Sequence, residues 1–239
     1  MKVCTRSLIV ALILLCAGCA SAQERGNPDP FENFNRGLFF FNDGLDRNIV
    51  APLSRGYRAI TPTFIERGVR NFFANLYDFN GAINAVLQGR FREAAQNGGR
   101  FVVNSTVGML GTLDIASEMG VAPYRTDFGH TLALWGFDSG PYLMVPFFGP
   151  RTVRSGTGFV FDTVASVQWG IDSTSLRLSL FALEVIDTRA ALTEAEELIT
   201  GDRYIFIRDI YLQQREAFVN DGVIQDSFLE SEEEFDWEE

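Results

Sequence analysis

Apolar side chains recur at helical spacing within DPFENFNRGLFFFNDGLDR, which begins at Asp29. The spacing predicts an amphipathic helix, and Asp29, Pro30 and Glu32 suit its start as cap, first helical position and capping-box carboxylate. Phe40 lies opposite the main apolar stripe. A helix that is apolar on two sides needs two apolar neighbours, and a lipid bilayer is one hypothesis for the second. The stripe comprises Phe31, Phe34, Leu38, Phe41 and Leu45.

A second amphipathic stretch follows Thr63 and Glu66, which repeat the capping-box spacing. Further on, Gly89 and the Gly98–Gly99 pair interrupt the pattern and predict shorter helical pieces. A closing apolar stripe predicts a last helix, which an Asn-Asp-Gly sequence ends. The predicted later helices cover residues 82–88, 90–104, 158–169, 176–186, 188–199 and 204–218.

The stretch from Gly120 to Gly158 has a different character. It holds seven of the 22 glycines and four of the eight prolines, together with many large apolar side chains. Such punctuation excludes long helices and predicts turns and short extended segments. Loops normally run over wet surfaces. A loop this apolar therefore packs on the domain or lines a space that is not water.

The N-terminus has the order of an export signal, because two basic residues precede an apolar run at 8–17. That run is too short to cross a bilayer, which takes about 20 residues. It ends in Ala-Gly-Cys19, the pattern at which signal peptidase cuts before a cysteine that becomes acylated, although Cys16 stands where leucine is usual. The alternative is ordinary secretory cleavage near residues 20–22.

Cleavage before Cys19 would leave this residue as the last of the three cysteines. Cys19 is therefore the predicted lipidation site, and an internal disulfide is excluded. Stable anchoring takes at least two acyl chains, and a bacterial lipoprotein carries three. Ala20 stands where aspartate would favour retention in the inner membrane, so we expect the outer membrane.

Charge and lysine content exclude several functions. Without the first 18 residues, 18 basic side chains face 31 acidic ones, and a net charge of −13 makes nucleic acid an improbable partner. Lys2 is the only lysine. The exported chain would thus have no lysine for a P-loop, a kinase strand or a Schiff base.

Phenylalanine is abundant, with 22 residues in a chain that is 46% hydrophobic. After the first 18 residues no segment reaches 18 consecutive apolar residues, so the excess is spread over amphipathic pieces. It predicts a large core, an apolar cavity or contact with lipid.

Catalytic equipment is sparse. His130 is the only histidine, no metal-ligand spacing surrounds it, and no G-x-S-x-G elbow singles out a serine. The DFG at 127–129 lacks the lysine and catalytic loop of a kinase. We predict no catalytic residue, no metal site and no cofactor.

We expect four parts along the chain: a signal peptide at 1–18, a tether at 19–28, one domain at 29–222 and a tail at 223–239. The last fourteen residues hold eight carboxylates and no basic group, which favours a solvated, disordered segment. Docking on a basic partner is the alternative for this tail.

Several motifs together resemble the MlaA family of outer-membrane lipoproteins, also called VacJ. Besides the first helix they are GVRNFFANL, NAVLQGR, RFVVNSTVGMLGTLDIA, DFGHTLALWGFDSGPYLMVPFFGPRTVR and YIFIRDIYLQQREAF, and they cover residues 29–218 in family order. His130, Cys16 and the short acidic tail depart from the family pattern. The residues that carry the resemblance are Asp29, Pro30, Phe31, Asn35, Arg36, Asn42, Asp46, Asn71, Phe72, Asn75, Gln88, Gly89, Arg100, Asn104, Asp127, Gly129, Gly136, Gly140, Pro141, Pro146 and Gly149.

The resemblance implies a mainly α, disc- or ring-shaped bundle of amphipathic helices, embedded in the outer membrane around an amphipathic channel. It implies removal of phospholipid that has strayed into the outer leaflet, and its transfer to a periplasmic carrier, MlaC. It also implies binding to a trimeric porin. The alternative function is an outer-membrane scaffold that conducts no lipid.

The stretch from Gly120 to Gly158 is the predicted channel segment, because irregular backbone at membrane depth must border protein or a wet cavity. We predict that six of its side chains face lipid, and filling a core is the alternative for each. They are Phe128, Leu132, Trp135, Tyr142, Leu143 and Phe147.

Overall fold

The computed structural model describes residues 28–193, 196, 199 and 201–220. The predicted signal peptide, Cys19, nearly all of the tether and the acidic tail lie outside these residues. Within them the protein is mainly α-helical, as predicted. No helix among the described residues is both long and apolar enough to cross a membrane.

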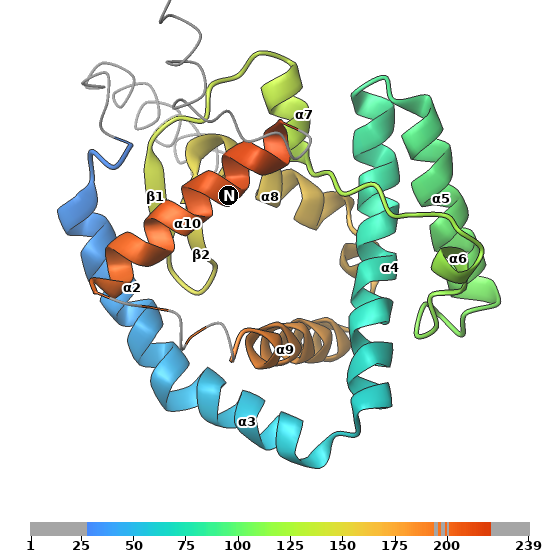
Figure 1. The fold of residues 1–239 in the computed structure, drawn as a ribbon, viewed down its shortest axis with the longest axis horizontal. Coiled ribbons are helices and arrows are strands. Elements are labelled where there is room, and N and C mark those ends of the chain that lie inside the picture. The colour runs from blue at the N-terminus through green and yellow to red at the C-terminus, as the bar shows by residue number, and fades with distance from the viewer. Residues whose placement is uncertain (1–27, 194–195, 197–198, 200, 221–239) are drawn as a thin grey trace, which may run out of the picture.

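The helices form a ring in which α2, α3 and α4 make up three sides, and α10 crosses in front of the remaining side (Figure 1). Helix α9 lies within the ring and is seen nearly end-on, while α5 and α6 pack outside α4. The elements, in chain order, are α2 (Glu32–Leu45), a π-helical turn η2 (Asp46–Val50), α3 (Ala51–Ile60), α4 (Thr63–Leu87), α5 (Phe91–Thr106), α6 (Ile115–Glu118), α7 (Phe128–Leu134), β1 (Tyr142–Val145), β2 (Gly149–Thr152), α8 (Val153–Ala165), the 3₁₀ turn η3 (Val167–Gly170), α9 (Thr174–Ala191) and α10 (Arg203–Val219).

Two backbone features shape the ring. The π-helical turn joins α2 to α3 without a break, so the chain bends while staying helical. The corner between α3 and α4 is sharp because Thr61, which precedes Pro62, is extended, with ψ of 122°. Pro62 is the N-cap of α4 and makes no side-chain cap.

Helices α4 and α5 form an antiparallel hairpin that is longer than predicted. The pieces expected at 82–88 and 90–104 belong to α4 and α5, and the Gly98–Gly99 pair does not break α5. Glycine serves close packing here, because a Cβ at Gly81 would come within 2.5 Å of the Asn97 amide nitrogen. Gly89 ends the first helix with a positive φ of 74°.

The Gly120–Gly158 stretch forms turns and a two-stranded antiparallel hairpin, as predicted, and also the short helix α7, which was not predicted. Tyr142 of β1 pairs with Thr152 of β2, and Leu143 pairs with Arg151. Helix α8 begins at residue 153 rather than 158, because Thr152 and Ser155 form a capping box. Further on, α9 is one helix where two were expected.

The predicted helix caps at the start of α2 and α4 are wrong. Phe31 is the N-cap of α2 and has no side-chain cap. Asp29 is instead 1% exposed and accepts hydrogen bonds from Asn35 (2.7 Å) and the Tyr204 hydroxyl. Two side-chain donors hold this carboxylate inside, so it does not reach the α2 amides.

Candidate functional site

The interior of this fold is unusually polar. Phe39, Tyr142, Met144 and Tyr204 form the apolar core cluster, where α2, β1 and α10 meet. Large fully buried side chains elsewhere are polar, although soluble proteins bury mainly apolar ones. They are His130, Asn35, Asn75, Asn84, Asn97, Thr131, Thr152, Asp29 and Ser54.

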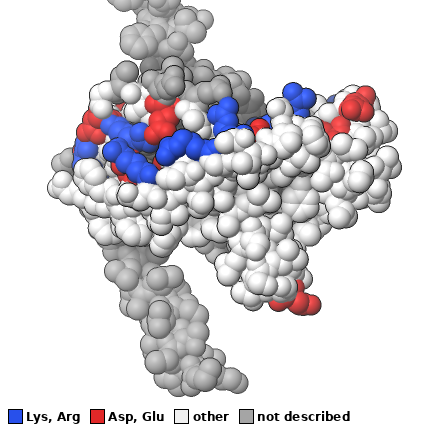
Figure 2. Space-filling model, turned by 90° about the horizontal axis from the view of Figure 1, so that it is seen from below, with Lys and Arg blue, Asp and Glu red and all other residues white. Residues whose placement is uncertain are grey.

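The outer surface is correspondingly apolar. In α2, Asn35 is fully buried, whereas Phe34 and Phe41 of the predicted apolar stripe are 63% and 49% exposed and Leu38 packs against the core cluster. Phe64 and Phe91, at the starts of α4 and α5, are 71% and 70% exposed. Surface of this kind marks contact with lipid or protein. Figure 2 shows most charged side chains gathered along the upper edge of the view, above a broad uncharged band, with a further acidic group at the tip of the lower projection.

Ion pairs connect α10 to α2 and to Glu196, which follows α9, and connect α9 to η2. Their members are drawn from distant parts of the chain, so they close the ring at this point. The pairs include Arg36–Asp202 (2.8 Å), Arg203–Glu196 (2.7 Å), Arg203–Asp43 (3.2 Å), Arg189–Asp46 (2.8 Å) and Arg208–Asp29 (3.6 Å).

Buried asparagines hold the irregular backbone. The Asn35 amide donates to the Tyr142 carbonyl (3.1 Å), and its oxygen accepts from the Met144 N–H (2.9 Å). The side chain thus pairs with β1 as the backbone of a neighbouring strand would. Asn42 makes the same pair of bonds to Val145 and Phe147. Such bonds satisfy backbone N–H and carbonyl groups of irregular segments that have no strand partner there.

Asn97 of α5 makes the same paired contact with the N–H and carbonyl of Tyr124, at 3.0 and 2.7 Å. Sequence reasoning did not single out this residue, or Asn84, which donates to Asp162 at 2.8 Å. The sequence signal for each was an asparagine within a predicted helix. That signal does not distinguish a buried asparagine from one on the helix surface.

Arg100 and Asn104 fix the loop after α5. Arg100 is 3% exposed and donates from Nε to Asp78 (2.9 Å), from Nη2 to Asp114 (3.0 Å) and from Nη1 to Ser117 (3.0 Å). Asn104 donates to Asp114 (3.0 Å). The guanidinium therefore has a partner on each of its nitrogens.

Most of the other residues that carry the family resemblance also form hydrogen bonds or packing contacts that hold the loops and helices together. Asn71 donates to the Thr112 carbonyl (3.1 Å), Asn75 to Ser105 (2.8 Å) and Gln88 to Thr126 (2.7 Å). Phe72 packs on Phe73, and the Pro141 carbonyl accepts from Val153 at 3.2 Å. Gly136, Gly140 and Gly149 have positive φ, while Pro30 and Pro146 are exposed at turns.

Asp127 joins α7 to α10. It caps α7 by accepting from the His130 N–H (2.7 Å), and both its oxygens accept from Arg215, one at 2.8 Å. Burial opposes the charged carboxylate, but Arg215 and the amide outweigh it and lower the pKa of Asp127. Gly129 makes room, since a Cβ there would come within 2.5 Å of Arg215.

His130 is fully buried beside this joint. Its Nδ1 lies 3.2 Å from the Thr126 hydroxyl, and its ring packs edge-on against Phe218, with centroids 5.7 Å apart. The histidine thus contributes to packing between α7 and the end of α10.

The two faces of the β1–β2 hairpin differ. Tyr142, Met144 and Thr152 are buried on one face, and the cross-strand pair Leu143 and Arg151 occupies the other. Arg151 lies over Phe159 of α8, with Cζ 4.8 Å from the ring centroid. Phe148 links Phe159 (5.0 Å between centroids) to Phe181 of α9 (6.0 Å).

Tyr77 of α4 lies on the same side, where its hydroxyl contacts the Glu184 carboxylate of α9. Burial raises the pKa of Tyr77, Glu184 adds to the rise, and the charge of Arg151 opposes it. Tyr77 is nevertheless 62% exposed, so solvent reaches this surface. We call this surface the interior face; its residues are Tyr77, Leu143, Phe148, Arg151, Phe159, Phe181 and Glu184.

The six side chains predicted to face lipid fall into different environments. Tyr142 is a wrong prediction, because it is fully buried against Tyr204 and Tyr211. Leu143, one position along the strand, lies on the interior face. Phe147 is 64% exposed at the hairpin turn, edge-on to Phe41.

The other three lie on α7. Phe128 stacks on Phe161 with centroids 3.8 Å apart and meets Trp135 edge-on at 5.7 Å. Trp135 is 51% exposed and Leu132 is partly buried. Lipid contact by these three, Leu143 and Phe147 stays a prediction.

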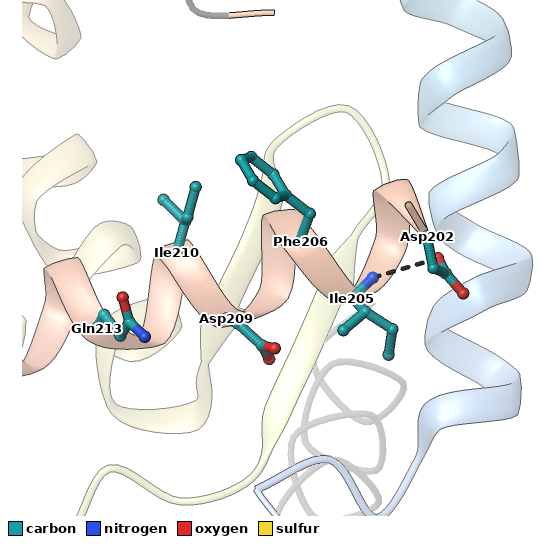
Figure 3. A pocket seen from close by; sticks show the side chains of 6 residues that line it. All are labelled: Asp202, Ile205, Phe206, Asp209, Ile210 and Gln213. Carbon is teal, nitrogen blue, oxygen red and sulfur yellow. Dashed lines mark hydrogen bonds between the residues drawn. The ribbon is translucent and has the colours of Figure 1, made fainter. Parts of the chain in front are cut away.

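A pocket of about 380 Å³ lies along α10, away from the residues of the interior face. In Figure 3, Phe206 and Ile210 point to one side of the helix and Asp209 to the other. Arg36 and Arg208 already pair with its carboxylates Asp202 and Asp209. The pocket therefore offers an apolar patch without an unpaired charge; its lining is Asp202, Ile205, Phe206, Asp209, Ile210 and Gln213.

Residues 27–218 match the MlaA lipoprotein family. The chain belongs to this family. Relatives named "Intermembrane phospholipid transport system lipoprotein MlaA" in Shigella flexneri and Escherichia coli (strain K12) are each 33% identical over 233 residues, which cover 94% of this chain and 92% of theirs.

A solved MlaA-like structure, described as "Structural basis for maintenance of bacterial outer membrane lipid asymmetry", has 31% sequence identity and a TM-score of 0.72. The match covers 81% of this chain and 100% of the other. The mainly helical MlaA fold expected from the resemblance is thereby confirmed. The family is one of transport lipoproteins, in keeping with the predicted absence of enzyme activity.

Proposed function

We propose that this chain is an outer-membrane lipoprotein that takes mislocalised phospholipid from the outer leaflet and delivers it to a periplasmic MlaC-like carrier, which maintains lipid asymmetry. Its relatives carry the name of an intermembrane phospholipid transport system. The observation that carries the proposal is the inverted polarity of the ring, with buried asparagines inside and exposed phenylalanines outside.

The energetics of lipid movement explain why such a ring is useful. Two acyl chains expose about 28 methylenes, so bringing them through water costs about 20 kcal/mol at ~0.8 kcal/mol each. An amphipathic route through the ring avoids most of that barrier. The lipid slides along side chains and no covalent bond changes, so the direction of transport must be set by other proteins.

Position in the membrane follows from the same polarity. The exposed apolar band would lie in the bilayer, the charged face would meet periplasmic water, and acylated Cys19 would tether the chain on that side. The uncharged rim offers a surface for a trimeric porin. Irregular backbone in the Gly120–Gly158 segment would border the channel, because its polar groups are paired internally.

Reconstitution tests this function. The acylated protein in vesicles should speed the transfer of labelled phospholipid to a soluble lipid carrier, relative to empty vesicles. Leu143→Arg on the interior face should slow transfer about tenfold or more, since a second charge beside Arg151 is costly to pass. Leu192→Arg, at the exposed end of α9, is the control. Transfer no faster than in empty vesicles, with porin binding intact, would instead favour a scaffold.

A further inference from the structure

Arg151 is placed where an arginine is unexpected. Side chains alternate along β2, and the buried Thr152 faces the core, so Arg151 projects from the hairpin on the opposite, interior face with Leu143. The surroundings on that side are mainly aromatic, and Phe148 and Phe181 there are 41% and 43% exposed. A permanent cation thus lies beside open apolar surface.

The guanidinium of Arg151 lacks a counter-charge. Among the residues that the structure describes, no carboxylate lies within 4.0 Å of it. Its Nε is buried without a hydrogen-bond partner, and Nη1 makes one long bond, 3.3 Å, to the adjacent Pro150 carbonyl. The Phe159 ring contributes a cation–π contact at 4.8 Å.

Several other partly buried arginines among the described residues form ion pairs. Arg189, Arg208 and Arg215 are 13–16% exposed in their side chains, and each has a carboxylate partner. Arginine stays charged at any physiological pH, so a half-buried guanidinium without an anion is costly.

Arg154 and Arg177 also have no carboxylate partner among the described residues, but Arg154 donates to the Phe137 carbonyl at 2.7 Å and Arg177 lies over Trp169. Arg151 differs in lying beside the aromatic side chains of the interior face, where it is available to an anion from outside the described protein.

We infer that Arg151 binds the phosphodiester of a phospholipid, with an acyl chain lying on Phe148, Phe159 and Phe181. This assignment rests on the proposed function and names the headgroup contact within it. Nη2, which makes no hydrogen bond to the described residues and is not buried like Nε, can donate to a phosphate oxygen, and the weakly held Nη1 to a second one. Glu184 on α9 bears the opposite charge and is engaged by Tyr77. The interior face thus offers the phosphate a single cation.

Arg151→Gln tests the contact while keeping a polar side chain of similar reach. Vesicles of phosphatidylethanolamine and phosphatidylglycerol, doped with labelled diacylglycerol, allow transfer of a lipid with and without phosphate to be compared in one assay. We expect R151Q to slow phospholipid transfer about tenfold and to leave diacylglycerol transfer unchanged. Arg151→Lys should retain part of the rate, and Arg92→Gln on the exposed side of α5 all of it.

Equal slowing of both lipids, or slowing of neither, overturns the assignment, and a matching thermal melt for each variant shows that it is folded. Binding of short-chain phosphatidylglycerol in detergent keeps the inference separate from transport. Even if the wild-type protein transfers no lipid, R151Q should weaken this binding about tenfold. Equal competition by inorganic phosphate would assign the site to free phosphate and also overturn the lipid assignment.

Discussion

Two arginines in different regions of the ring have opposite surroundings. Arg100, between α4, α5 and α6, has acceptors for all its nitrogens, including the carboxylates of Asp78 and Asp114. Arg151, on the interior face, has one weak bond to its own strand and an aromatic ring. A saturated guanidinium fixes structure, whereas an unsaturated one keeps its donors for another molecule.

The largest expected loss of stability follows from substitution of Arg100. Arg100→Met should destabilise the fold by about 3–5 kcal/mol, because it removes the cation that pairs with the buried Asp78 and the partly exposed Asp114. Arg151→Gln should change stability by less than about 0.5 kcal/mol, because no described partner is stranded. Chemical unfolding in detergent, followed by circular dichroism, measures both.

Arg92→Met on the exposed side of α5 is the control for loss of a guanidinium from that helix. Similar destabilisation by the Arg100 and Arg151 substitutions would mean that Arg151 is structural, and the contrast between the regions would disappear.

The next largest effect is expected at Asn35, whose side chain holds the backbone of the hairpin. Asn35→Leu should cost about 2–4 kcal/mol, because the Met144 N–H and the Asp29 carboxylate lose a buried partner. The Met144 amide should exchange with deuterium much faster, which mass spectrometry or NMR detects. Asn33→Leu, on the exposed side of the same helix, should leave exchange unchanged, and equal effects of both would contradict the role given to Asn35.

Sequence periodicity was sufficient to predict most helices, but not which side of each faces inward. In α2 the spacing identifies the stripe that contains Phe34 and Phe41, yet the side that packs inward carries Asn35 and Phe39. Hydrophobic pattern specifies an apolar side without saying whether protein or lipid covers it. The excess of phenylalanine is the sequence signal for lipid contact, and the buried asparagines support the same proposal.

The site was predictable at the level of a segment and not of single residues. Within Gly120–Gly158, adjacent positions of one strand have opposite environments: Tyr142 fills the core and Leu143 does not. A shift of one residue along the strand would change which of the two side chains is buried. The observed register depends on packing against α10, which is about 60 residues away in sequence. Arg151 was missed as well; its signal was a charge at an alternating position in an apolar hairpin.

Arg215 lies between the two extremes, and loss of its pairing should have a smaller effect than the substitutions of Arg100 and Asn35. Its partner Asp127 has a pKa below the ordinary value, so the folded state favours the charged carboxylate. The stability from this pair is complete above the unfolded-state pKa of about 3.9 and is lost as pH falls through the lower folded-state value. Asp127→Asn should therefore cost about 1–2 kcal/mol at neutral pH and progressively less below about pH 4. Unfolding measured from pH 7 to pH 3 gives the difference, with the exposed Asp138→Asn as control. A difference that stays constant over this range would show that the charge of Asp127 is not what joins α7 to α10.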